Sequence, residues 1–227
     1  FSLILLGQSR NYLIHTVTAI RDRKETTMKI LLIGASGLIG TAIAAQIADD
    51  HEIISEGHTR GDVTVDLASN ASIRHMFEQV GPLDGVISTA GVANFGPFDQ
   101  LPDKEFQLAL NNKLMGQVNL VRLGRASVND GGSITLTSGV LSREPLPGGV
   151  PVRMANGELE RCVKAAAPDL DAFRTNVVSP GVVTETIAMP AKDTTVGLYA
   201  PAAPTAYLCD RAALLSARTT LPRRVGD

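Results

Sequence analysis

The segment from Ile30 to Gly40, Ile-Leu-Leu-Ile-Gly-Ala-Ser-Gly-Leu-Ile-Gly, constrains the fold of this chain more than any other. Its four leading apolar residues are typical of a parallel strand that is covered on both faces. Gly34 permits a tight turn, Gly37 lets the backbone approach a pyrophosphate, and Gly40 lets the following helix pack on the strand. The first N–H groups of that helix would face the phosphates. The segment predicts a dinucleotide-binding turn, although a strand-to-helix turn without a ligand would have the same glycine spacing.

The composition fits a single globular domain and excludes several kinds of partner. The chain has 227 residues, is 44% hydrophobic and carries a formal net charge of −2. This balance gives no electrostatic reason to expect a nucleic acid or an anionic membrane as partner. No stretch approaches the ~18 apolar residues of a membrane span, and no metal-ligand spacing is present. Two distant cysteines, Cys162 and Cys209, indicate free thiols in a reducing compartment. We therefore expect a cytoplasmic protein.

Strand-like and helix-like segments alternate along the chain. Strands are expected at 30–33, 52–55, 62–66, 85–89, 133–137 and 172–178, and helices at 41–48, 69–80, 101–127 and 153–167. The alternation predicts an α/β protein with a Rossmann-type, doubly wound parallel sheet and helices on both faces. The carboxyl ends of the strands would then converge on one crevice, where such sheets bind ligands.

The two ends of the chain differ in character from the rest. The first methionine is Met28, so residues 1–27 are expected to be a non-native or disordered extension of a single domain spanning 28–227. After about residue 218, Pro222 and two arginines suit a central strand poorly, which argues against a last strand there.

Several further motifs resemble the short-chain dehydrogenase/reductase family. They are Asp66-Leu67, Thr89-Ala90-Gly91, Thr137-Ser138-Gly139 and Asn176-Val-Val-Ser-Pro-Gly181, and with the glycine turn they cover about residues 28–186 in the right order. The resemblance implies an NAD(P)-binding oxidoreductase that acts on a carbonyl or alcohol substrate, whose identity the sequence does not indicate. It also implies a homodimer or homotetramer in which the helices at about 111–127 and 153–167 pack between subunits.

The resemblance also implies a set of cofactor-binding residues. Asp66 would bond the adenine amino group and Leu67 would supply a backbone contact. Ala90 and Gly91 would line the adenosine ribose, and Pro180-Gly181 would shape the nicotinamide pocket. The whole expected set is Gly34, Ser36, Gly37, Leu38, Ile39, Gly40, His58, Thr59, Arg60, Asp66, Leu67, Thr89, Ala90, Gly91, Pro180, Gly181 and Val183.

The end of the second strand favours NADP over NAD. A preference for NAD usually needs an Asp or Glu there, which accepts hydrogen bonds from the ribose 2′-OH. The chain has Gly57-His58-Thr59-Arg60 at this point and no carboxylate until Asp62. A guanidinium and a hydroxyl suit a 2′-phosphate because Arg offers a charged, forked donor. NAD stays an alternative, since Arg60 could instead be a solvated loop charge.

The pair of residues that performs the family's proton chemistry is absent. In the family a Tyr transfers the proton, a Lys four residues later lowers the pKa of that phenol, and a Ser positions the carbonyl. This chain keeps Ser138, but Val152 and Asn156 stand in the Tyr and Lys slots. Lys113 stands where a helper Asn belongs, although a one-residue shift could restore an Asn there, since Asn111 and Asn112 lie just upstream. Valine has no proton to transfer and a neutral Asn cannot depress a neighbour's pKa. The chain thus resembles a small subgroup that keeps the cofactor motif without the usual active-site residues.

Two functions follow from this combination. The first is an atypical NADP-dependent oxidoreductase, whose proton could come from water, Ser138, Arg153 or Lys113. The second is a non-catalytic NADP-binding sensor or scaffold. Ser138 is the one candidate catalytic residue of the family pattern that is present, and it could instead satisfy backbone groups of its turn.

Overall fold

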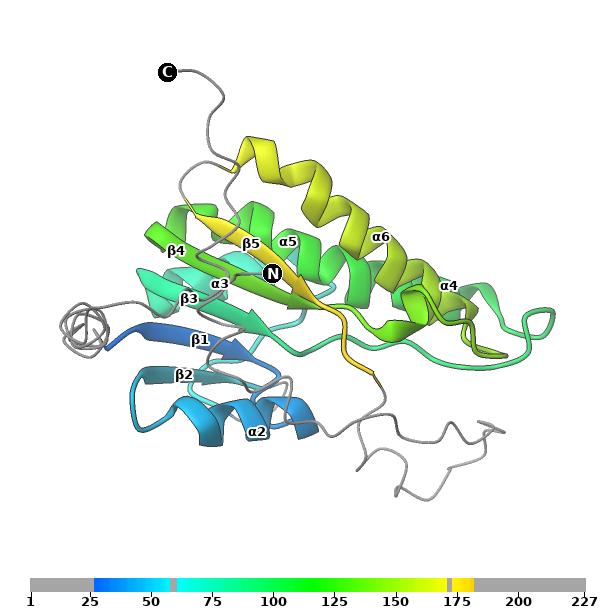
Figure 1. Ribbon diagram of the computed structural model, residues 1–227, viewed down its shortest axis with the longest axis horizontal. Coiled ribbons are helices and arrows are strands. Elements are labelled where there is room, and N and C mark those ends of the chain that lie inside the picture. The colour runs from blue at the N-terminus through cyan, green and yellow to red at the C-terminus, as the bar shows by residue number, and fades with distance from the viewer. Residues whose placement is uncertain (1–26, 58–60, 171–172, 182–227) are drawn as a thin grey trace, which may run out of the picture.

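A five-stranded parallel sheet forms the centre of the computed structural model, which describes residues 27–57, 61–170 and 173–181 (Figure 1). The strands are β1 (Lys29–Ile33), β2 (Glu52–Glu56), β3 (Leu83–Ser88), β4 (Val128–Thr137) and β5 (Arg174–Val178), in the order β2-β1-β3-β4-β5. The helices are α2 (Leu38–Ile47), α3 (Asn70–Val80), α4 (Asp103–Leu108), α5 (Met115–Gly124) and α6 (Val150–Ala166). All strand pairs are parallel, which confirms the predicted Rossmann-type, doubly wound sheet.

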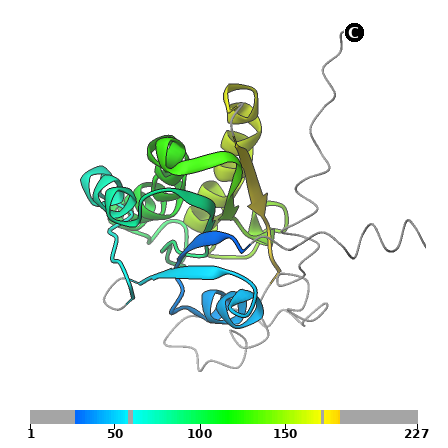
Figure 2. The same ribbon diagram turned by 90° about the vertical axis from the view of Figure 1, so that its left-hand side faces the viewer.

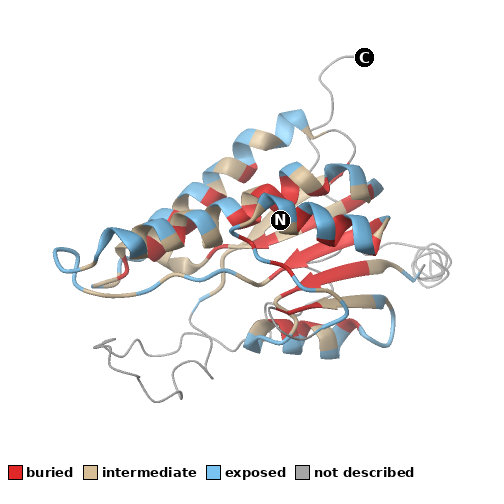
Figure 3. Ribbon diagram, turned by 180° about the vertical axis from the view of Figure 1, so that it is seen from behind, coloured by how far each residue is buried: buried red, intermediate tan, exposed pale blue. Residues whose placement is uncertain are grey.

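Alternation along β1 divides the core between the two faces of the sheet. Leu31 and Ile33 belong to a cluster with apolar residues of α3, α5 and α6, whereas Ile30 and Leu32 pack with residues of α2. Figure 2 accordingly places α2 on one side of the sheet and α3, α5 and α6 on the other. The central strands are therefore buried on both faces, as the red ribbons of Figure 3 show.

The predicted strand at 62–66 is wrong. Only Val63 pairs with the sheet, through an isolated parallel bridge to Glu56. The reason is local, because the carboxylate of Asp62 accepts hydrogen bonds from the N–H and the hydroxyl of Ser55, both at 2.8 Å. These bonds fold the chain back onto β2, so that it cannot run alongside as a full strand. Val63 still lies outside β2, where a Rossmann sheet has its third strand.

The predicted helical segment 101–127 consists of two α-helices joined by a π-helical turn. This turn, η1 (Ala109–Leu114), lies between α4 and α5, and the segment ends in the short 3₁₀ turn η2 (Arg125–Ser127). Two further 3₁₀ turns are η3 (Val140–Ser142) and η4 (Ala167–Asp169). π-Turns inside helices frequently occur at functional sites, and η1 packs against α6.

Several predictions fall on residues 1–26, 58–60, 171–172 and 182–227, which lie outside the described residues. They include the N-terminal extension, the absent last strand, Cys209, and the cofactor candidates His58, Thr59, Arg60 and Val183. Within the part of the chain that the structure describes, no helix has the length and apolar character needed to cross a membrane.

Candidate functional site

The carboxyl ends of neighbouring strands meet at one edge of the sheet and are tied together by hydrogen bonds. At the end of β3, the Thr89 N–H donates to the carbonyl of Ile33 at 2.8 Å, and the Thr89 hydroxyl lies 3.1 Å from the same oxygen. At the end of β4, the Ser138 N–H donates to the carbonyl of Val178 at 2.8 Å. The glycine turn, Thr89-Ala90-Gly91, Ser138 and Pro180-Gly181 therefore lie along the same edge, as the predicted strand order requires.

The glycine turn forms an open cradle after β1. Gly34 has a φ of +81°, and a Cβ at this position would lie 2.8 Å from Thr89 Oγ1. A Cβ at Gly40 would lie 2.1 Å from the Gly34 carbonyl oxygen, so only glycine lets α2 approach so closely. Ser36, Gly37 and Leu38 are exposed, and no side chain caps the N-terminus of α2. The first N–H groups of α2 are thus open to an anionic ligand.

Glu56 supports this turn and was not among the residues predicted from the sequence. The side chain is only 3% exposed. Its carboxylate accepts hydrogen bonds from the N–H groups of Gly34 and Val65, both at 3.1 Å, and its backbone carbonyl accepts from Ala35 N–H at 3.0 Å. The available signal was its place as the last residue before Gly57, where a parallel strand ends beside a turn rich in N–H donors.

The other expected cofactor residues lie close to this edge, with different environments. Asp66 is exposed, and its carboxylate accepts from the N–H of Ala68 at 2.9 Å. The Leu67 side chain belongs to the core and is 5% exposed, which leaves its backbone for a ligand. Gly91 is exposed with a φ of +147°. Pro180 is half-buried and Gly181 exposed.

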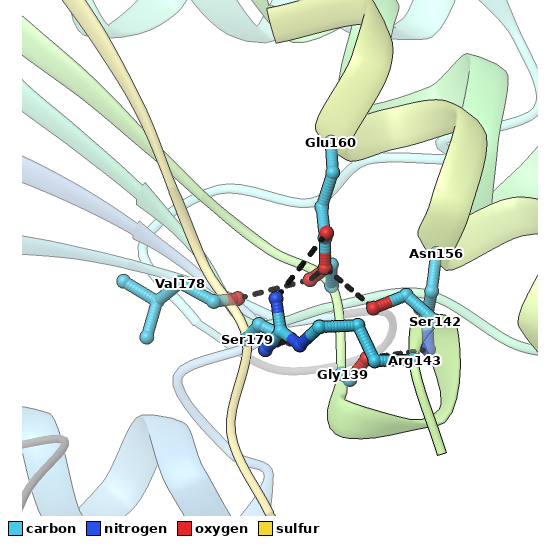
Figure 4. A network of polar contacts seen from close by, with 8 residues as sticks. Gly139, Ser142, Arg143, Asn156, Glu160, Val178 and Ser179 are labelled. Carbon is cyan, nitrogen blue, oxygen red and sulfur yellow. Dashed lines mark hydrogen bonds and ion pairs between the residues drawn. The ribbon is translucent and has the colours of Figure 1, made fainter. Parts of the chain in front are cut away.

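Ser138 belongs to a polar network centred on Glu160 (Figure 4). The Ser138 hydroxyl donates to Glu160 Oε1 at 2.7 Å, and the Ser142 hydroxyl donates to the same oxygen at 2.8 Å. The Arg143 guanidinium lies 3.5 Å from Glu160 Oε2 and donates to the Ser179 hydroxyl at 3.0 Å. Partial burial by itself would raise the pKa of Glu160, but the serine hydrogen bonds and the charge of Arg143 outweigh it and lower the pKa.

This network changes what Ser138 can do. A serine hydroxyl has one proton, and Ser138 gives it to Glu160, so its oxygen offers a ligand lone pairs only. No pattern pointed to Glu160, because the residue approaches Ser138 only after α6 has packed beside the ends of β4 and β5.

The Tyr and Lys slots of the family are filled by buried side chains. Val152 is 8% exposed and Asn156 is 2% exposed. The Asn156 amide nitrogen lies 3.5 Å from the Gly139 carbonyl, and its Oδ1 has no hydrogen-bond partner among the described residues. Arg153, beside the Tyr slot, donates from Nε to the Leu141 carbonyl at 3.0 Å. Residues 27–57, 61–170 and 173–181 contain no tyrosine that could replace the missing one.

Lys113 lies in η1 at the same edge of the sheet. Its half-buried side chain runs over Gly91, where a Cβ on the glycine would be 3.0 Å from Lys113 Cγ. The neighbouring Asn112 accepts a hydrogen bond from the N–H of Val92 at 2.8 Å, which fixes the loop after β3 against η1. In the described part of the chain, no three His, Cys, Asp or Glu side chains gather as a metal site would require.

Comparisons with known proteins agree with this architecture. Residues 30–208 match a family model described as enoyl-(acyl carrier protein) reductase. The short-chain dehydrogenase/reductase ATR9 of Stachybotrys chlorohalonatus is 29% identical, over 72% of this chain and 77% of that protein. The L-xylulose reductase of Mesocricetus auratus is 27% identical, over 68% of this chain and 65% of that protein.

Two solved structures are also similar. The protein lin1944 from Listeria innocua is 39% identical with a TM-score of 0.76, covering 81% of this chain and 90% of that one. A small-chain dehydrogenase solved in complex with NADPH is 27% identical with a TM-score of 0.63, covering 70% of this chain and 72% of that one. Since the family model matches well over half of the residues, this chain belongs to the short-chain dehydrogenase/reductase family.

Proposed function

We propose that this chain is an NADP(H)-dependent oxidoreductase that interconverts a carbonyl and an alcohol without the family's Tyr–Lys pair. The observation that carries the proposal is the exposed glycine turn at the carboxyl edge of the sheet, with the uncapped N-terminus of α2 behind it. Such a turn offers N–H donors and the positive end of the helix dipole to a pyrophosphate. NADPH, when bound, supplies the hydride for the carbonyl carbon.

The chain's own residues would then bind the cofactor and orient the substrate. The turn from Gly34 to Gly40 would hold the pyrophosphate, and Asp66, Leu67, Ala90 and Gly91 would line the adenosine. Pro180, Gly181 and Val183 would border the nicotinamide, and Ser138 would accept a hydrogen bond from the substrate side. Among the described residues Asn156 Oδ1 has no hydrogen-bond partner, and it would suit a hydroxyl donor such as a ribose.

Three observations favour NADP over NAD. The segment His58-Thr59-Arg60 follows β2, where its guanidinium and hydroxyl would meet a 2′-phosphate. The two carboxylates nearest to this segment are both engaged by backbone N–H groups, Glu56 by Gly34 and Val65 and Asp62 by Ser55. A structurally similar dehydrogenase was solved with NADPH. The last observation concerns that protein and supports the choice here by analogy.

A second candidate is an NADP-binding sensor or scaffold without turnover. The observation that favours it is the state of the family's reactive positions, since Val152 and Asn156 are buried and the Ser138 proton is bonded to Glu160. The two candidates differ in one property, the oxidation of bound NADPH by carbonyl compounds.

The test is a fluorescence titration of the purified protein with NADPH and with NADH. We expect micromolar binding of NADPH and weaker binding of NADH, with the difference lost in Arg60→Ala. Gly37→Asp provides a sharper variant, because Asp is a good N-cap and preserves the helix while its charge repels the pyrophosphate. It should fold and lose NADPH binding, whereas Gly37→Ala, which adds a methyl group without a charge, should weaken binding less. Undiminished binding in Gly37→Asp would overturn the proposed site.

We also propose a cytoplasmic homodimer or homotetramer assembled through α5 and α6. The exposed side chains of Met115 on α5 and Met154 on α6, 37% and 42% accessible, support this interface. Light scattering of the native chain should report a multiple of the 23.9 kDa subunit, and Met154→Glu should reduce it.

A further inference from the structure

We propose that Lys113 is the proton donor of this site. As the carbonyl carbon of the substrate receives a hydride from NADPH, the electron pair of the C=O π bond moves to oxygen, which takes a proton from Lys113 Nζ. The products are the alcohol, NADP⁺ and a neutral lysine amine, which regains its proton from water. This assignment rests on the proposed function and names the group that replaces the missing tyrosine.

Lys113 lies between two strand ends. Its side chain packs along Gly91, which follows β3. Its backbone carbonyl accepts a hydrogen bond at 3.2 Å from the side-chain amide of Gln117, which is fully buried. The same amide accepts from the N–H of Thr137 at 2.8 Å and donates to its carbonyl at 2.9 Å. Gln117 therefore fixes Lys113 beside the end of β4, one residue before Ser138.

Lys113 belongs to the π-turn η1. An α-helical run through 103–124 would direct this residue differently, because a π-turn inserts a residue and rotates everything that precedes it. The turn packs against α6, which holds Val152 and Asn156. The turn that carries Lys113 thus packs directly against the helix that holds the two positions of the family's proton-transferring pair.

The ammonium group of Lys113 is available to a ligand. No described residue forms a hydrogen bond or an ion pair with Lys113 Nζ. On the elements packed against η1, Glu105 of α4 accepts from Asn94, Glu160 of α6 is engaged by Arg143, and Glu158 of α6 pairs with Arg161. Burial lowers the pKa of Lys113 from its ordinary value of 10.5 without a compensating carboxylate. A lowered pKa brings an ammonium closer to the range in which a general acid works at neutral pH.

The other candidates at this edge are less suited to donate a proton. Ser138 already gives its only proton to Glu160. Arg153 donates to the Leu141 carbonyl, and a guanidinium does not release protons in proteins. The pKa of Glu160 is lowered, so that group is a carboxylate without a proton at neutral pH. Lys113 combines a releasable proton with a place between the ends of β3 and β4.

The kinetic test uses two substitutions that keep different properties of the lysine. Lys113→Met keeps an apolar stem against Gly91 and removes the proton, and Lys113→Arg keeps the charge but holds its proton too tightly. Both should bind NADPH within about threefold of wild type and lose roughly 10²–10⁴-fold in kcat with a panel of ketones and aldehydes. Lys164→Arg, at an exposed position of α6, is the matched control and should keep its kcat.

A second readout needs no turnover. Acetylation of the cofactor-free protein over a pH series, resolved by peptide mass spectrometry, should show that Lys113 becomes reactive at lower pH than it does in the urea-unfolded chain. Saturating NADPH should slow the reaction at Lys113 and leave Lys104 of α4 unaffected.

The outcomes separate the two proposals. Full kcat in Lys113→Arg would overturn the assignment of Lys113 and leave the oxidoreductase standing. Binding of NADPH without turnover of any carbonyl would overturn both in favour of the sensor. Absence of NADPH binding in wild type would remove the proposed function itself.

Discussion

Glu160 connects four segments that are far apart in sequence. It binds hydroxyls from the end of β4, from η3 and from the end of β5, and its own element is α6. Hydrogen bonds to an ionised group contribute about 1.5–3 kcal/mol each in net stability, more than neutral ones. The network therefore holds the ends of β4 and β5 against α6, and it engages the one proton of the Ser138 hydroxyl.

Replacement of Glu160 by Gln should destabilise the fold at neutral pH by about 1–3 kcal/mol, because the serine hydroxyls lose a charged acceptor. The folded-state pKa of Glu160 lies below its ordinary value of 4.5. Its contribution is thus complete above pH 4.5 and is lost as the pH falls through the lowered pKa. Thermal melts from pH 7 to pH 3 should show the two curves converging at low pH.

Glu158→Gln is the matched control for that series, since Glu158 is exposed and 4.0 Å from Arg161. An exposed pair of this kind contributes about 0–1 kcal/mol, so the control should follow wild type. If the stability gap between wild type and Glu160→Gln did not change between pH 7 and pH 3, the charge of Glu160 would have no part in the network.

Restoring the family's pair should fail, because both slots are filled. Asn156 is 2% exposed, and a Cβ on Gly139 would already lie 2.9 Å from its amide nitrogen. Val152→Tyr with Asn156→Lys would overpack this region at a cost of about 1–3 kcal/mol. We expect a lower melting temperature and no gain in turnover.

Arg161→Tyr with Ala165→Lys has the same spacing on the exposed side of α6 and should melt like wild type. If the Val152→Tyr, Asn156→Lys double variant were as stable as wild type and had a higher turnover, the two slots would be open. Lys113 would then be dispensable for proton transfer.

At the scale of elements, the approach of α2 to the turn after β1 depends on one missing Cβ. Gly40→Ala would place a methyl group 2.1 Å from the Gly34 carbonyl oxygen. We expect a loss of about 2 kcal/mol or more, since both contacting segments are backbone and cannot move aside. Urea unfolding of the variant measures this loss.

Gly157→Ala is the natural counterpart of that variant. Gly157 lies inside α6 with no atom within 4 Å of its would-be Cβ, so alanine should stabilise by about 0.5–1 kcal/mol through helix propensity. If Gly40→Ala lowers the free energy of unfolding and Gly157→Ala raises it, packing and not helix propensity determines the stability effect at residue 40. Equal signs would contradict it.

For the molecule as a whole, the two core clusters should unfold together as one domain. Ile43→Ala weakens the cluster under α2, and Leu120→Ala weakens the cluster under α3, α5 and α6. Truncation of a buried Leu or Ile typically costs 2–5 kcal/mol. Each variant should shift a single cooperative transition, followed by circular dichroism in urea. Two separated transitions in either variant would contradict the single domain.

Local patterns predicted most of the sheet. The apolar run at 30–33, the glycine turn, and the Ser69 cap with the Gly81 stop of α3 each depend on neighbours in sequence, and the structure has them. The strand at 62–66 failed because a single side chain, Asp62, folds the chain back on Ser55. The roles of Glu56, Glu160 and Gln117 could not be predicted, since each depends on partners that only the tertiary fold brings near.

We propose above all that the carboxyl edge of the sheet binds a dinucleotide on the glycine turn. Amide hydrogen exchange, measured by mass spectrometry with and without NADPH, tests it most directly because it maps the ligand onto the backbone. We expect slower exchange at 34–40 and 89–92, and no change at 50–52 and 81–83, which lie at the amino ends of β2 and β3. Unchanged exchange at 34–40 with NADPH bound would contradict the claim.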